Sequence, residues 1–178
     1  MRLDNSEHLK NDWWVHDYAR EHDLELLDLW QYPIAGGADD FERFLAIHDL
    51  EAMVAETSVI VRALFGLRMV LGRIFKWEDE GAAESMDEIY RDDREMVGRI
   101  ENATVTALMH LAWAPLENGG DGADKDDDGG SHTAQLAVYA TPKGRFGGLY
   151  MQAIGPFRHL FVYPALMKAG KKRWEARA

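Results

Sequence analysis

The sequence predicts an α+β domain in which a long C-terminal helix lies across a curved antiparallel sheet, with two short helices nearer the N-terminus. Two long segments alternate between apolar and polar residues, as half-buried strands do. An aromatic-rich amphipathic segment closes the chain, and such a helix needs a concave surface to pack against. The 178 residues are enough for one domain with a single core.

The N-terminal part of the chain is predicted to contain an arm, a strand and a helix. Residues 1–22 are mostly polar and indicate a loosely held arm whose few aromatic rings dock on the domain. The domain itself is expected to span residues 23–178. Residues 24–34 alternate imperfectly, as a first strand does before a proline turn. Asp39 is the predicted N-cap of a short helix that reaches Leu50.

A second, longer helix is predicted over residues 57–77. Arg68 lies about 120° away from the polar stripe of this helix and is flanked by leucines. Its guanidinium therefore either extends to solvent at the edge of the packing surface or meets a buried partner. The second alternative makes Arg68 a candidate anchor for a carboxylate of the protein or of a ligand.

The middle of the chain is predicted to form the antiparallel sheet. Two short strands, residues 86–91 and 95–98, are separated by an aspartate-rich turn. Residues 102–114 carry apolar side chains at every odd position, and residues 132–141 alternate in the same way, so the two segments predict an antiparallel pair. His110 falls on the even face of its strand, which predicts that it points away from the core.

The loop between these two strands, residues 116–131, is acidic and rich in glycine, and we expect it to be exposed. Asp124 to Asp128 match the opening of a calcium loop, where alternate carboxylates converge on the cation. The twelfth position is Gln135, which cannot supply the bidentate carboxylate. The pattern therefore favours a solvated hairpin tip over a calcium site.

The closing apolar segment is predicted to be an amphipathic helix whose aromatic side faces the sheet. The aromatic stripe consists of Phe146, Tyr150, Phe157 and Phe161. Arg158 borders the predicted cavity and is a candidate for contact with a ligand, with a salt bridge to a protein carboxylate as the alternative. His159 lies opposite the stripe, which predicts that it is exposed. Pro156 and Pro164 each remove a backbone donor and are expected to bend the helix.

Composition excludes several classes of function. The formal net charge of −11 opposes binding to nucleic acids or anionic membranes, because both attract Lys and Arg. Without cysteine the chain has no disulfide, thiolate nucleophile or Cys-based metal site, which fits a reducing cytoplasm. The first residues lack the apolar run of a secretory signal. Arg158 and His159 interrupt the only long apolar segment, which argues against a transmembrane span.

No motif indicates catalysis, a metal or a cofactor. The seven histidines show no H-x-x-x-H or H-E-x-x-H spacing. The serines lack a G-x-S-x-G elbow, and the glycine-rich entry to the closing helix lacks the lysine of a P-loop. We therefore predict no catalytic residue, no metal and no cofactor.

Three stretches resemble a bacterial family of uncharacterised proteins of the DUF2867 type: residues 61–73, residues 95–98 and the segment Gly144-Arg-Phe-Gly-Gly-Leu-Tyr-Met-Gln-Ala-Ile-Gly-Pro156-Phe-Arg-His159-Leu. The resemblance covers roughly residues 20–174, and the family is similar to the helix-grip superfamily of polyketide cyclases and START-type lipid-binding proteins. It implies a helix-grip fold and brings no catalytic residues. After Gly98 the chain departs from the Asp-Asp-x-His-like sequence common in the family, so no polar function of that strand is carried over.

The function predicted from these observations is binding of a small apolar molecule between the sheet and the closing helix. The candidate ligand-binding residues are Arg68, Trp77, Met109, Trp113, Tyr150, Phe157, Arg158 and Phe161. The alternative is an interaction module with a filled core, whose arm or outer sheet face meets a partner or a second copy in a homodimer. A cyclase-like or aromatase-like enzyme is the least supported, because the predicted interior offers few acid–base groups.

Overall fold

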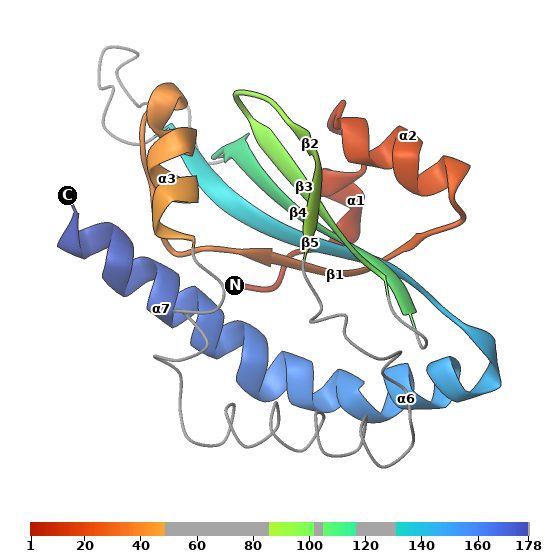
Figure 1. Cartoon of the computed structure of the whole chain (residues 1–178). Coiled ribbons are helices and arrows are strands. Elements are labelled where there is room, and N and C mark those ends of the chain that lie inside the picture. The colour runs from red at the N-terminus through yellow and green to blue at the C-terminus, as the bar shows by residue number, and fades with distance from the viewer. Residues whose placement is uncertain (49–85, 102–104, 117–130, 178) are drawn as a thin grey trace.

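The computed structural model describes residues 1–48, 86–101, 105–116 and 131–177 (Figure 1). The helical elements are α1 (Asn5–His8), α2 (Trp14–Glu21), the 3-10 turn η1 (Ala38–Asp40), α3 (Phe41–Ile47), α6 (Gly144–Phe157), the π-helical turn η2 (Arg158–Val162) and α7 (Tyr163–Ala176). The strands are β1 (Glu25–Gln31), β2 (Asp87–Arg91), β3 (Glu95–Glu101), β4 (Val105–Pro115) and β5 (His132–Pro142). The predicted helix over residues 57–77, with Arg68 and Trp77, and the loop core that contains Asp124 and Asp128 lie outside the described residues.

The five strands form one antiparallel sheet in the order β1-β5-β4-β3-β2. The long pair predicted from the alternating segments is present: Met109 of β4 lies opposite Val138 of β5, and Leu111 lies opposite Leu136. Because side chains alternate along a strand, these residues share one face of the sheet. The α+β class and the antiparallel sheet are therefore confirmed.

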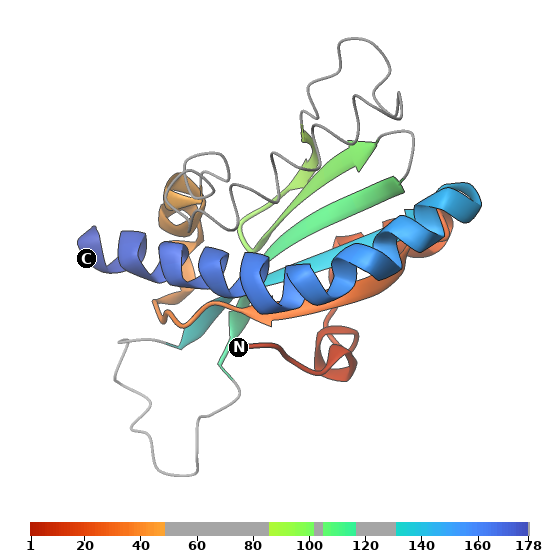
Figure 2. The same ribbon diagram turned by 90° about the horizontal axis from the view of Figure 1, so that it is seen from below.

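One face of the sheet is covered by the continuous helical run α6–η2–α7, which crosses the strands, and by α3 at one end (Figures 1 and 2). The core between these helices and the sheet is dominated by large rings. Its buried members include Trp30, Tyr32, Phe41, Phe44, Ile47, Met109, Leu111, Trp113, Leu136, Tyr163, Leu166, Met167 and Trp174.

The opposite face is covered by the N-terminal arm, and an aromatic ring of the arm docks on the domain, as the sequence predicts. α1 and α2 lie on the side of the sheet away from α7 (Figure 1). Val15 is fully buried and Trp13 is 4% exposed. Residues at the start of the arm also extend the β1 edge, where Leu3 N–H donates to the Leu29 carbonyl over 3.1 Å. This face is apolar as well, and the arm shields it from water. Its buried members include Trp13, Val15, Ala19, Leu29, Val97, Leu108, Ala112, Ala137 and Tyr139.

Two local details differ from the sequence prediction. The N-cap position of the first predicted helix is Asp40 instead of Asp39, and the Asp40 carboxylate accepts the Gly37 N–H at 2.9 Å without capping the helix itself. His110 does point away from the helix-covered core, as its strand position predicts, yet its side chain is 0% exposed because the arm lies over it.

Candidate functional site

A buried carboxylate on β1 is the centre of the candidate site. Asp28 is 1% exposed and lies on the helix-covered face together with Trp30. A β-bulge precedes it, since the pairing of β1 with β5 shifts register between Leu26 and Asp28. Bulges often re-aim a side chain next to a functional site. The extra residue, Leu27, explains both the imperfect alternation of this strand and the presence of a carboxylate on an apolar face.

Three side chains from the closing helix converge on Asp28. Tyr163 O–H donates to Oδ2 over 2.8 Å. Arg158 Nη2 lies 3.3 Å from Oδ2, and His159 Nε2 lies 3.0 Å from Oδ1. A carboxylate this deeply buried needs such partners, because a lone charge in a protein interior is costly. Arg158 thus contacts a protein carboxylate, which is the alternative that the sequence left open.

Arg158 and His159 belong to the π-helical turn η2, and Tyr163 follows it directly. Residues five apart, such as Arg158 and Tyr163, share one side of a π-helix, whereas in a regular α-helix they are about 140° apart. The wider turn of η2 lies between Pro156 and Pro164, each of which leaves a backbone carbonyl without its usual N–H donor. Single π-helical turns inside an α-helix are frequent at functional sites.

Several polar atoms of this cluster are buried without a hydrogen-bond partner. Within the described part of the chain they are Asp28 Oδ1, Trp30 Nε1, Arg158 Nε and His159 Nδ1. Asp28 Oδ1 is among them although His159 Nε2 lies 3.0 Å away, so these two atoms are close but are not aligned as a hydrogen bond. Burial, and then the Asp28 carboxylate, raise the pKa of Tyr163, so its hydroxyl remains a donor. Unpaired buried donors are uncommon in folded proteins and cost about 1–3 kcal/mol each.

Those predicted ligand-binding side chains that the structure describes lie in different surroundings. Met109 and Trp113 belong to the core under the helices. Tyr150 is in α6, but its side chain is outside the described set. Phe157 is 48% exposed and Phe161 is 36% exposed, so the prediction that the aromatic stripe faces the sheet is wrong for both.

His159, predicted to be exposed, instead points inward. The second half of the helix sets this orientation, because a clear apolar stripe faces the core there. The stripe comprises Tyr163, Leu166, Met167, Gly170 and Trp174. Extended back through the π-turn, it reaches Arg158 and His159 and leaves the phenylalanines outside. The apolar stripe of α7 was the sequence signal for this orientation of the helix. It was obscured because the side chains were placed at a constant 100° per residue across two prolines.

The side of the closing helix that faces the sheet can be tested by measuring how substitutions on each side change stability. Replacing the exposed Phe157 by Ser is expected to lower the free energy of unfolding by less than about 1 kcal/mol, because little apolar surface loses burial. The same change at Met167, which is 5% exposed, is expected to cost about 2–5 kcal/mol. Urea unfolding followed by circular dichroism measures both. A larger loss at Phe157 than at Met167 would restore the orientation predicted from the sequence.

A second buried polar cluster lies on the arm-covered face. His110 Nε2 is 3.0 Å from a Glu95 carboxylate oxygen, and His110 Nδ1 is 3.3 Å from His8 Nε2. His8 Nδ1 is in turn 3.0 Å from the side-chain amide of Gln135. Glu95 also accepts the backbone N–H of Trp14 over 2.8 Å. Because His8, Glu95 and His110 are each at most 2% exposed, we interpret this chain of contacts as the attachment of the arm.

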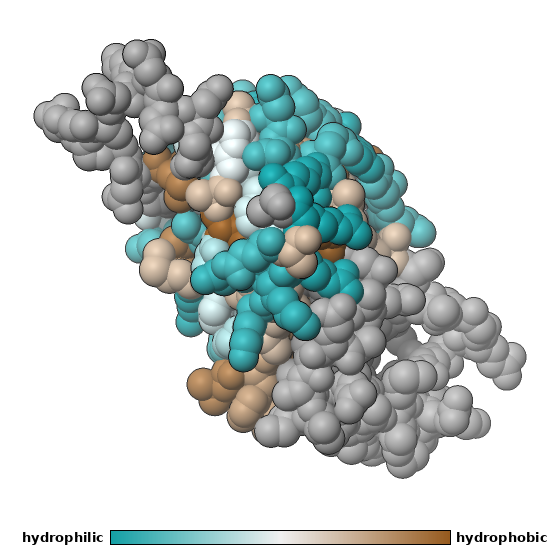
Figure 3. Space-filling model, turned by 90° about the vertical axis from the view of Figure 1, so that its left-hand side faces the viewer, coloured by the Kyte–Doolittle hydropathy of each residue, from teal (hydrophilic) through white to brown (hydrophobic). Residues whose placement is uncertain are grey.

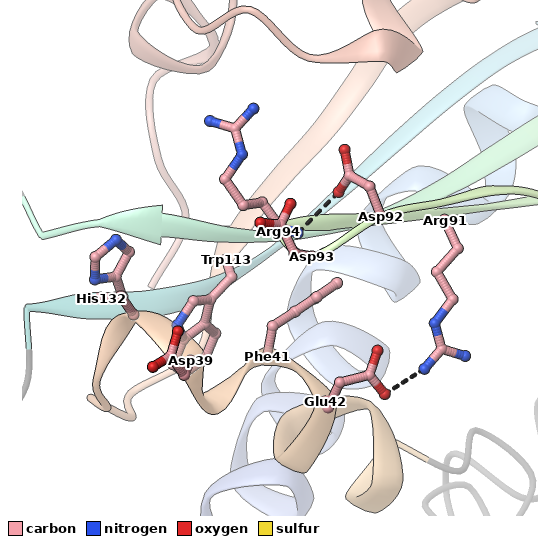
Figure 4. A pocket seen from close by; sticks show the side chains of 10 residues that line it. Asp39, Phe41, Glu42, Arg91, Asp92, Asp93, Arg94, Trp113 and His132 are labelled. Carbon is pink, nitrogen blue, oxygen red and sulfur yellow. Dashed lines mark hydrogen bonds and ion pairs between the residues drawn. The ribbon is translucent and has the colours of Figure 1, made fainter.

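A cleft of about 560 Å³ lies between the start of α3 and the turn that joins β2 to β3 (Figure 4). Three of its charged groups have partners: Arg91 pairs with Glu42, and Asp92 accepts the backbone N–H groups of Arg94 and Glu95. The Trp113 indole, another part of its wall, donates to the Gly37 carbonyl over 2.8 Å. The cleft therefore shows less evidence of an unmet binding requirement than the Asp28 cluster does.

The surface at the end formed by α3 and α7 is mainly hydrophilic among the coloured residues of Figure 3, with smaller hydrophobic areas between them. Among the described residues, no three His, Asp or Glu side chains are arranged to hold a metal ion. No helix in that part of the chain is long and apolar enough to cross a membrane.

The model of a family described as a protein of unknown function, DUF2867, matches residues 20–165. The chain belongs to this family. The DUF2867 match includes Asp28, the π-turn and Tyr163, and it leaves most of the arm outside. No curated protein and no solved structure matches the chain.

Proposed function

We propose that the protein binds a small molecule that combines an apolar body with a hydrogen-bond-accepting oxygen, between the sheet and the π-turn. The observation that carries the proposal is the buried Asp28 cluster, in which the donors Arg158 Nε and Trp30 Nε1 have no partner among the described residues. A ligand oxygen would satisfy such donors. Specific pockets commonly combine an apolar lining with a few placed polar groups.

The surroundings of the cluster favour a ligand with a planar or aromatic body. The Trp30 ring stacks on Tyr163 with 5.2 Å between centroids and on His159 with 6.3 Å. Arg158 and His159 keep 20% and 27% of their side chains exposed, so a solute can reach them from one side. The long closing helix across an antiparallel sheet supports the helix-grip resemblance, which implies ligand binding in the same place.

The charge of the cluster favours a neutral oxygen on the ligand. Asp28 and Arg158 are opposite charges in contact, and a second carboxylate placed beside them would meet repulsion from Asp28. A ketone or amide oxygen accepts hydrogen bonds from the free donors without adding charge. We therefore propose a carbonyl compound as the ligand class.

The experiment uses prodan, a naphthalene that carries a propionyl ketone and whose emission shifts to the blue when it leaves water. We expect saturable binding with a blue shift. Arg158→Met is expected to weaken binding at least about tenfold, because a hydrogen bond from a charged donor contributes about 1.5–3 kcal/mol. Fluorescence titration measures both quantities, and urea unfolding verifies that each variant is folded.

The matched control is Arg99→Met, which removes the same charge from β3, where Arg99 pairs with Glu101 and is 37% exposed. Prodan binding should be unchanged in this variant. A protein that shows no saturable shift, or that loses binding equally in both variants, contradicts the proposal and favours an interaction module with a filled core.

A further inference from the structure

We infer that His159, held beside Asp28, acts as a general base that removes a proton from the carbon next to the carbonyl group of the bound molecule. This inference rests on the proposed function and adds a reaction to it. Asp28 is the positioning residue, and Arg158 provides the donor for the oxygen on which negative charge develops.

The position of His159 determines which nitrogen is available as a base. Its Nε2 lies 3.0 Å from the Asp28 carboxylate, where a lone pair would be repelled, so we assign the hydrogen to Nε2 although the contact is not aligned as a hydrogen bond. In the neutral imidazole the other nitrogen, Nδ1, then has the lone pair. Nδ1 is buried and has no hydrogen-bond partner among the described residues. A base oriented by a carboxylate, with its second nitrogen free, is the arrangement that proton abstraction requires.

Neighbouring groups hold this arrangement in place. The His159 ring contacts Tyr163 at 5.9 Å and Trp30 at 6.3 Å between centroids. Among the described residues, the charged or titratable groups that face it are Asp28 from β1 and Arg158 and Tyr163 from the helix, and Arg2 of the arm acts on Tyr163 electrostatically. Because Arg158 adjoins His159 on the π-turn and its Nε is unpaired, a donor is available near the base.

The chemistry fits a substrate with a hydrogen on the carbon next to a ketone. The carbon–hydrogen bond breaks, the proton moves to His159 Nδ1, and the electron pair forms the carbon–carbon double bond of an enolate. The negative charge is then on oxygen, where a guanidinium N–H stabilises it. Return of the proton to the same or another carbon completes an exchange or an isomerisation. No oxidant, reductant or co-reactant is needed.

Prodan tests this step as well, since its propionyl group has two such hydrogens. In heavy water, at protein concentrations that saturate prodan, we expect prodan to exchange these two hydrogens for deuterium. Mass spectrometry should show this exchange to be faster than in the same heavy-water buffer without the protein. The rate is expected to fall at least about tenfold in His159→Gln, because general base catalysis typically contributes 10²–10⁴-fold. His22→Gln, on the exposed end of α2, is the control and should exchange as fast as the unchanged protein.

Two further readouts separate a catalytic His159 from a structural one. Nitrogen NMR should show Nδ1 of His159 unprotonated in the neutral ring, with this preference lost in Asp28→Asn. The exchange rate should decrease on acidification in parallel with protonation of the same ring. Prodan that binds but exchanges no faster than in buffer, or equally fast in His159→Gln, overturns the inference and leaves the binding proposal standing. Failure of prodan to bind overturns both.

Discussion

Deletion of residues 1–22 is expected to leave a chain that unfolds or aggregates at room temperature. The arm buries Trp13 and Val15 against the sheet, and full burial of each large apolar side chain contributes about 1.5–3 kcal/mol. Its loss also exposes apolar residues of the sheet such as Leu108 and Ala137. Domains of this kind have a total stability of about 5–15 kcal/mol, so the expected loss is a large fraction of it.

A pair of single substitutions measures the same attachment in a folded protein. Trp13→Ala is expected to lower the free energy of unfolding by about 3–5 kcal/mol, because it creates a cavity under the arm. Leu9→Ala changes a residue of the same arm that is 55% exposed, and it should cost less than about 0.5 kcal/mol. Urea unfolding measures both. Similar small losses in the two variants would show that the arm is held as loosely as its composition suggests.

The strands illustrate what alternation in a sequence can and cannot predict. The period of two correctly separated the faces of β4: Met109, Leu111 and Trp113 on one side, and His110 on the other. It could not show that the second face is also buried. That face is covered by α1 and α2, which have 4 and 8 residues and too few apolar positions to indicate a packed layer.

The candidate site was predictable only in part, because two local irregularities create it. Arg158 could be singled out as a charge in an apolar helix, and the broken alternation of residues 24–34 was visible. Neither observation indicated that Leu27 is the extra residue of a bulge and that Asp28 therefore faces the helix. The π-turn has the same effect on the helix, since it rotates the side chains that follow it. Periodic patterns assume regular geometry, and both irregularities depend on tertiary contacts.

Stability is expected to decrease as the pH falls below about 6.5, because the arm is attached through neutral histidines. Burial, followed by the proximity of His110, lowers the pKa of His8 to about 3. Burial also lowers the pKa of His110, against the opposing effect of Glu95, and that of His16. Between about pH 6.5 and about pH 3 the unfolded chain therefore binds more protons than the folded one. His8 contributes a slope of about 1.4 kcal/mol per pH unit in that range, and His110 and His16 add to the loss in the same direction.

The measurement is urea unfolding at about pH 6 and about pH 4.5, an interval that lies mostly above the range where ordinary carboxylates titrate. The unchanged protein should lose about 2 kcal/mol or more between the two conditions. His8→Gln keeps a polar group beside Gln135 but cannot be protonated, so it should lose less by about 1–2 kcal/mol. His22→Gln, at an exposed position, should follow the unchanged protein. An equal pH dependence in all three proteins would mean that protonation of His8 does not oppose docking of the arm, and that the acid sensitivity arises elsewhere.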